Sequence, residues 1–243
     1  MTDNLWERLK VDRVHMAPRA FDLSPSQVQQ RYRSAWAPLV DLLGKLRPSP
    51  DGLLRFWLCQ PGGHVVITHL GSRYEEGERD LKSGPIHNVA YAGLTDLAAG
   101  SLEALVPVGR MLDHLLGSGG ATDGPWLSEG GGVSSALEGV GSQIARLFPL
   151  GYGFDALACH DVRSYFSRSL AMYVQDRRAL NVADPHVERL LRTTLFSAAF
   201  WRSHHSERDR ISADSRRRRG APVRKARCRP PDPAGRTLWR VRS

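Results

Sequence analysis

The sequence holds little cysteine and no long apolar run. Its three cysteines, Cys59, Cys159 and Cys228, are far apart and odd in number, which excludes a disulfide framework and fits a reducing compartment. No stretch approaches the roughly 18 consecutive apolar residues of a membrane helix. The N-terminus has no basic region followed by an apolar one, so no signal peptide is expected. These absences predict a cytoplasmic protein without a membrane partner.

Net charge is also scarce, except at one end of the chain. Residues 1–202 hold equal numbers of basic and acidic side chains, so the formal net charge of +9 belongs entirely to residues 203–243. A neutral body gives no reason to expect a nucleic-acid-binding fold. The hydrophobic content of the whole chain, 41%, is that of a globular protein.

Residues 203–243 are rich in arginine and lack apolar periodicity, so we expect them to form a disordered basic tail. The run Arg216, Arg217, Arg218 and Arg219 could neutralise nucleic-acid phosphates, which makes nucleic acid a candidate partner of the tail alone. Out-of-frame translation of a GC-rich gene gives the same Arg-, Pro-, Gly- and Ala-rich composition, and this alternative stands beside the first.

Capping residues and apolar periodicity predict a mainly helical body. A capping residue introduces each of three predicted helices. Ser134 is the first residue of 134–148, Asp161 precedes 162–174, and Asp184 precedes 185–196, in which Pro185 takes the first helical position. The N-terminal residues 1–48 read as a helical segment. In it, a longer helix over residues 24–46 has Ser24 as its cap and Pro25 in its first turn, and Pro38 kinks or divides it.

The predicted strands lie in the first half of the chain. Residues 53–59 and 64–70 read as a hairpin, 72–83 as a solvated loop and 86–93 as a third strand. We therefore predict an α+β fold, with a small sheet packed on a mainly helical body over residues 49–202.

The centre of the body is a helix predicted over residues 107–116. Its apolar positions recur at helical spacing: Val108, Met111, Leu112, Leu115 and Leu116. Pro107 fits the first turn of this helix, where its missing N–H costs no hydrogen bond. Arg110 and Asp113 are separated by about one helical turn, which predicts an ion pair between them.

The motifs around this helix resemble the anthrax-lethal-factor-like branch of the zincin metallopeptidases. In that family a central H-E-x-x-H helix is followed by Tyr-Gly, then by a helix reading roughly Glu-Tyr/Phe-Phe-Ala-Glu-x-Phe/Leu-x-x-Tyr, and then by a helix that Asp-Pro introduces. This chain has Gly151-Tyr-Gly153, then Ser164-Tyr-Phe-Ser-Arg-Ser-Leu-Ala-Met-Tyr173, then Asp184-Pro185. The resemblance covers about residues 86–201 and implies a zincin-like domain.

The residues that perform the chemistry in that family are replaced here. Val106, Pro107 and Arg110 stand where the family has its first His, its Glu and its second His. Ser164 stands where it has a third metal ligand, the first Glu of the later helix, and Arg168 stands where that helix has its second Glu. The first two offer no donor atom, Arg110 is always protonated, and Ser164 offers only a hydroxyl group. Tyr152 alone keeps its type, because it is similar to a family tyrosine that assists the oxyanion.

The resemblance also implies two spatial relations. Helices 107–116 and 162–174 should touch, and a strand beside the central helix should bind an extended peptide by strand addition. In strand 86–93, His87 and Tyr91 could line such a groove, although we favour ordinary sheet positions for both.

Two functional hypotheses follow. The first is a zincin-like domain that has lost its cofactor and serves as a non-catalytic binding or scaffold module for a protein or peptide partner. The second is a metal-dependent hydrolase, with zinc, whose ligands lie elsewhere among Asp113, His114, His160 and Asp161. Because Asp113 and His114 are adjacent, they project about 100° apart and do not reproduce a pair one turn apart.

Overall fold

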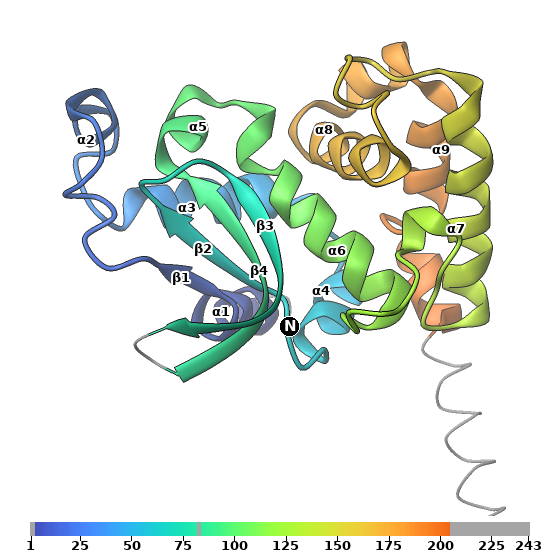
Figure 1. The fold of residues 1–243 in the computed structure, drawn as a ribbon, viewed down its shortest axis with the longest axis horizontal. Helices are drawn as coiled ribbons and strands as arrows, with labels where there is room; N and C mark the ends of the chain where they lie inside the picture. The colour runs from blue at the N-terminus through green and yellow to red at the C-terminus, as the bar shows by residue number, and fades with distance from the viewer. Residues whose placement is uncertain (1–2, 82–83, 205–243) are drawn as a thin grey trace, which may run out of the picture. The chain divides into compact units, whose positions relative to one another are not determined.

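A computed structural model, which describes residues 3–81 and 84–204, contains one sheet of four strands in the order β1-β2-β4-β3 (Figure 1). Strands β1 (Val14–Met16), β2 (His64–Thr68) and β4 (Gly84–Gly93) pair in parallel, whereas β3 (Arg73–Leu81) runs antiparallel to β4. In this part of the chain β3 pairs with no strand except β4, so it is an edge strand. The predicted α+β class is confirmed.

One face of the sheet packs into the main hydrophobic core. Val65 and Ile67 of β2, together with Ala90 and Ala92 of β4, are fully buried in that core. They are alternate residues, as expected for side chains on the same face of a strand. Val66, between the first two, belongs to a separate and smaller cluster on the other face.

Helices supply the rest of the core. The first half of the chain forms α1 (Asp3–Asp12), α2 (Ser26–Tyr32), α3 (Ala37–Leu46), α4 (Asp51–Leu58) and α5 (Leu94–Ala99). A short 3-10 helix, η1 (Leu102–Ala104), precedes α6 (Val106–Ser118), and α7 (Ser135–Leu147), α8 (Val162–Ala183) and α9 (Pro185–Thr193) follow. Helix α6 contacts β3 and β4 on one side and α7 and α8 on the other, so it lies between the sheet and the later helices (Figure 1).

Three of the four predicted caps are confirmed. Ser24 is not a cap, because α2 begins after Pro25 and the Ser24 hydroxyl donates to the carbonyl oxygens of Ala20 and Phe21. The side chains of Ser134, Asp161 and Asp184 accept hydrogen bonds from first-turn amides of α7, α8 and α9. Helix α8 runs beyond the predicted residue 174 to Ala183, past one non-helical residue at Asp176. The N-terminal helix is divided as predicted, but just before Pro38: α2 ends at Tyr32, and α3 begins at Ala37 with Pro38 in its first turn.

The predicted hairpin of residues 53–59 and 64–70 is wrong, because residues 51–58 form helix α4. Leu53, Phe56 and Trp57 are buried at i, i+3 and i+4, the spacing of one helical face. A short apolar run of this length does not by itself distinguish a strand from a buried helix. The second half of the prediction holds, since β2 occupies residues 64–68.

The solvated loop predicted for residues 72–83 is also wrong where the structure describes it, because β3 occupies residues 73–81. Its sequence, Arg-Tyr-Glu-Glu-Gly-Glu-Arg-Asp-Leu, has no alternation of apolar and polar residues. Charged side chains are common on edge strands. The edge position therefore explains why the pattern was misleading.

The described residues up to His204 belong to one compact unit. Strand β1 lies inside the predicted N-terminal segment 1–48 and pairs with β2, so no break in the fold follows residue 48. Residues 198–204 are helical, and His204 is buried against the ring of Trp201. Arg216 to Arg219 lie outside the described residues. No helix in the described part is both long and apolar enough to span a bilayer.

Candidate functional site

A close approach of α6 and α8 depends on Gly109. A Cβ atom at this position would lie 2.5 Å from the carbonyl oxygen and 2.9 Å from the Cα atom of Ser167, so a larger residue would force the helices apart. At the next residue, Arg110 Nη2 donates to Ser164 Oγ at 2.9 Å. The predicted contact of the two helices is confirmed. It joins two positions at which the family resemblance places metal ligands.

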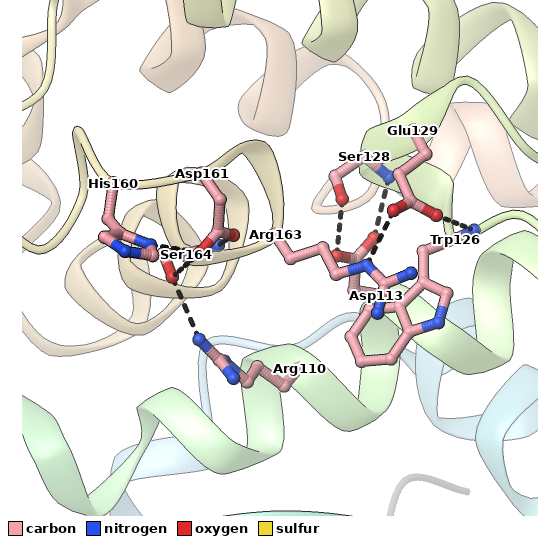
Figure 2. Close-up of polar contacts among 9 residues, drawn as sticks. All are labelled: Arg110, Asp113, Trp126, Ser128, Glu129, His160, Asp161, Arg163 and Ser164. Atoms are coloured by element: carbon pink, nitrogen blue, oxygen red, sulfur yellow. Dashed lines mark hydrogen bonds and ion pairs between the residues drawn. The ribbon is translucent and has the colours of Figure 1, made fainter.

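Ser164 also belongs to a network at the start of α8 (Figure 2). Asp161 accepts from the Ser164 amide through Oδ1 at 2.7 Å and from the Ser164 hydroxyl through Oδ2 at 2.9 Å. The same Oδ2 lies 2.9 Å from His160 Nδ1. Burial alone would raise the pKa of Asp161, but the hydrogen bonds from His160 and Ser164 and the charge of Arg110 outweigh it and lower that pKa to about 2.

The connectivity of this network differs from that of a serine nucleophile. A serine hydrolase needs its hydroxyl bonded to an imidazole that can take the proton. Here Ser164 and His160 both bond to the carboxylate of Asp161, and the hydroxyl proton of Ser164 is directed at Asp161. The lone pairs of Ser164 Oγ are left to accept from Arg110. The network therefore orients Arg110 and does not activate Ser164.

These residues line a cleft of about 590 Å³. Most of its lining comes from three places: Val106, Pro107 and Arg110 of α6; His160, Asp161, Ser164 and Arg168 at or just before the start of α8; and Ser72, Arg73 and Tyr74 at the start of β3. Glu103 of η1 and Leu157 complete it. The cleft thus lies next to an edge strand of the sheet, as well as at the crossing of α6 and α8.

Arg168 fixes another wall of the cleft. It is bonded to Glu103 of η1 through Nη1 at 2.7 Å and to Asp155 through Nη2 at 2.7 Å, with its side chain only 9% exposed. An arginine held by two carboxylates has its charge compensated and its geometry fixed. The family resemblance places a second Glu of the helix at this position. The arginine found here instead links the loop that contains Asp155 to η1 through its two ion pairs.

Tyr74 joins the edge strand to α6. Its hydroxyl lies 2.7 Å from Nδ1 of His114, and the other ring nitrogen, Nε2, lies 3.0 Å from the carbonyl oxygen of Ala121. Since a carbonyl only accepts, Nε2 carries the proton and Tyr74 donates to Nδ1. The His114 ring also stacks on Trp126 at a centroid distance of 4.9 Å. Burial raises the pKa of Tyr74, which keeps its hydroxyl a donor.

The predicted ion pair of Arg110 with Asp113 is wrong. The Asp113 carboxylate is fully buried and accepts from the amide and the hydroxyl of Ser128, both at 2.7 Å (Figure 2). Burial raises the pKa of Asp113 to about 7, against the opposing effect of the Ser128 hydrogen bonds. The partner was missed because it lies in a short 3-10 helix, η2 (Leu127–Glu129), 15 residues later in the chain, and helical spacing cannot reveal such a contact.

The four alternative metal ligands are not brought together. Asp113 and His114 are buried and bonded to Ser128 and to Tyr74, whereas His160 and Asp161 bond to each other at the cleft. Over residues 3–81 and 84–204, no group of three or more His, Cys, Asp or Glu side chains is arranged to hold a metal ion.

Three further candidates lie away from the lining of the cleft. Tyr152 is 40% exposed, and its ring lies 5.1 Å from that of His186. His87 is exposed on β4. Tyr91 lies under the guanidinium of Arg73, at 4.0 Å from the ring centroid to Cζ. The preference for ordinary sheet positions fits the placement of these two residues.

The cleft, its arginines and the adjoining edge strand are the features from which a function can be argued. No family model, no curated protein and no solved structure matches this chain. Sequence reasoning had placed Arg110 and Ser164 together but missed Ser72, Arg73 and Tyr74, because it read their segment as a loop. Arg168 had been noted only as a replaced position, and its carboxylate partners are distant in sequence.

Proposed function

We propose that the body is a non-catalytic, zincin-like module that binds an extended segment of a protein or peptide partner along β3. The observation that carries this proposal is the coincidence of a sheet edge with a cleft. β3 pairs with β4 on one side only among the described strands, and its first residues line the cleft. An edge strand presents N–H and C=O groups to which an extended peptide can add as a further strand.

The side chains at the crossing of α6 and α8 support the non-catalytic part of the proposal. A catalytic zinc site needs three protein ligands and one open position. Val106 and Pro107 have no donor atom, and the guanidinium of Arg110 is always protonated. Its positive charge at the place of a metal ligand would repel a cation. Tyr152, the one position of matching type, lies beside His186 instead.

Peptide addition to β3 has a distinctive signature. A library of heptapeptides would be screened with the full chain in about 150 mM salt, which limits non-specific attraction to the basic tail. The tightest peptide would then be N-methylated at one residue at a time. Since alternate residues of a strand face the pairing partner, methylation at every second position should abolish binding, and methylation between them should not.

Uniform tolerance of N-methylation would refute strand addition. The non-catalytic part is tested separately, by the metal content of the full chain and of a chain ending at His204. Stoichiometric zinc in both samples, with peptide hydrolysis that a chelator abolishes, would overturn it and favour the hydrolase hypothesis.

A further inference from the structure

The three arginines that line the cleft differ in their partners. Arg73 bonds to Glu75 at 2.7 Å, and Arg168 bonds to Glu103 and Asp155. Arg110 bonds to the hydroxyl of Ser164, and no carboxylate in the described part of the chain lies within 4.0 Å of it as an ion-pair partner. Its charge is therefore compensated less directly than that of the other two.

The hydrogen bonds around Ser164 leave part of the Arg110 guanidinium available. A guanidinium has five N–H donors in a planar fork, and the contact with Ser164 Oγ uses the Nη2 end (Figure 2). Asp161 is near enough for Arg110 to lower its pKa. However, the oxygens of Asp161 already accept from Ser164 and face His160.

An arginine of this kind favours one type of ligand group. Removing a charge from water is unfavourable unless the charge is paired and hydrogen-bonded, and Arg110 is half-buried. The planar fork matches the two oxygens of a carboxylate. We propose that Arg110 binds a carboxylate group of the peptide that lies along β3. This inference rests on the proposed function and names the chemical group that the cleft recognises.

Ser164 is the positioning residue for this interaction. Its hydroxyl donates to Asp161 and so presents lone pairs to Arg110, and Gly109 allows α8 close enough for the 2.9 Å contact. Arg110 is thus oriented before a ligand arrives. A carboxylate at a peptide C-terminus and one on an Asp or Glu side chain share the required chemistry, and the experiment below separates them.

The test compares modified peptides on matched protein variants. The tightest heptapeptide from the library would be prepared as the free acid, as the C-terminal amide, and with each Asp or Glu changed to Asn or Gln. The full-length proteins would be the parent chain, Arg110→Gln, Arg110→Lys and the control Arg178→Gln. Arg178 lies on α8 outside the cleft lining, so its replacement removes the same charge away from the site.

We expect one of these peptide changes to weaken binding by about ten- to a hundredfold, the range for a hydrogen bond to a charged group. Arg110→Gln should cost the same factor, and the two changes together should cost little more. Arg110→Lys should fall between, because it keeps the charge and loses the fork, while Arg178→Gln should have no effect. The sensitive change identifies whether the carboxylate is terminal or belongs to a side chain.

Two outcomes would overturn the inference in different ways. If peptides bind but Arg110→Gln and carboxylate removal act independently, the carboxylate assignment fails and the peptide-binding module stands. If no peptide binds, the proposed function fails, and N-acetylglycine would be titrated while the NMR signal of the Arg110 Nε–H is followed. If N-acetylglycine shifts this signal saturably and the N-methylamide of N-acetylglycine does not, Arg110 remains a carboxylate site. No shift, or a tighter response to inorganic phosphate, would reject it.

Discussion

Replacing Gly109 by alanine tests the packing that joins α6 to α8. The added methyl group would lie 2.5 Å from the carbonyl oxygen of Ser167, so the helices must separate or the backbone must shift. Overpacking of this kind costs about 1 to 3 kcal/mol. Alanine in a helix is favoured over glycine by about 1 kcal/mol, and this gain offsets part of the cost.

Gly139→Ala is the matched control, because it isolates the steric effect. Gly139 is exposed within α7, and a Cβ atom there would meet nothing within 4 Å. Both variants gain the same helix propensity, so their difference in unfolding free energy should equal the packing cost alone, about 1 to 3 kcal/mol. For a body of this size that corresponds to roughly 2 to 12 °C in Tm.

Thermal and urea unfolding of the two full-length variants would measure this difference. The Gly139 variant should be more stable than the parent chain and the Gly109 variant less stable than the control. Equal stabilisation of both variants would refute the argument, because it would show that α8 accommodates the methyl group without cost. A destabilised Gly109 variant should also bind peptide more weakly, since the Arg110 contact with Ser164 depends on the same crossing.

Three other perturbations have defined outcomes. Asp113→Asn should reduce the pH dependence of stability. The pKa of Asp113 is about 7 in the folded chain, against 3.8 for an unperturbed aspartate as in the unfolded chain. The parent protein therefore loses stability as pH rises from 4 to 7, by at most about 4 kcal/mol, and Tm measured across that range should fall less in the variant. Ending the chain after His204 should leave Tm nearly unchanged, because the core lies in residues before it, and a large drop would contradict the predicted tail. Any nucleic-acid binding should vanish in that truncation and weaken steeply with salt. Zinc-dependent hydrolysis, measured with zinc added, should require four changes together: Val106→His, Pro107→Glu, Arg110→His and Ser164→Glu. Hydrolysis by a variant with fewer of these changes would contradict our account of the site.

Local signals in the sequence predicted the parts of the fold that depend on local chemistry. Ser134, Asp161 and Asp184 were identified as caps because a cap and the amides it bonds are within three residues of each other. Pro107 placed the start of α6 to within one residue, since proline is tolerated only in the first turn. Such features are decided before tertiary packing, so a single sequence is enough to find them.

The parts that were missed depend on neighbours far along the chain. Residues 53–58 became helical because their buried face packs into the core, and residues 73–81 became a strand because β4 was there to pair with them. In the site, Arg110 was placed near Ser164 through the family resemblance, while its other expected partner, Asp113, was taken by Ser128. Each error concerns a contact with a residue distant in the sequence, which the spacing of apolar residues within one segment does not indicate.

The hydrogen bond between Tyr74 and His114 has a consequence for the kinetics of binding. It ties the edge strand to the helix that carries Arg110, so the width of the opening between them is set in the empty protein. A site that is already formed loses little conformational entropy when it is occupied. Association should therefore proceed in a single phase whose rate rises linearly with peptide concentration. Tyr74→Phe, which removes the bond and keeps the ring, should slow association and add a second phase as the opening adjusts.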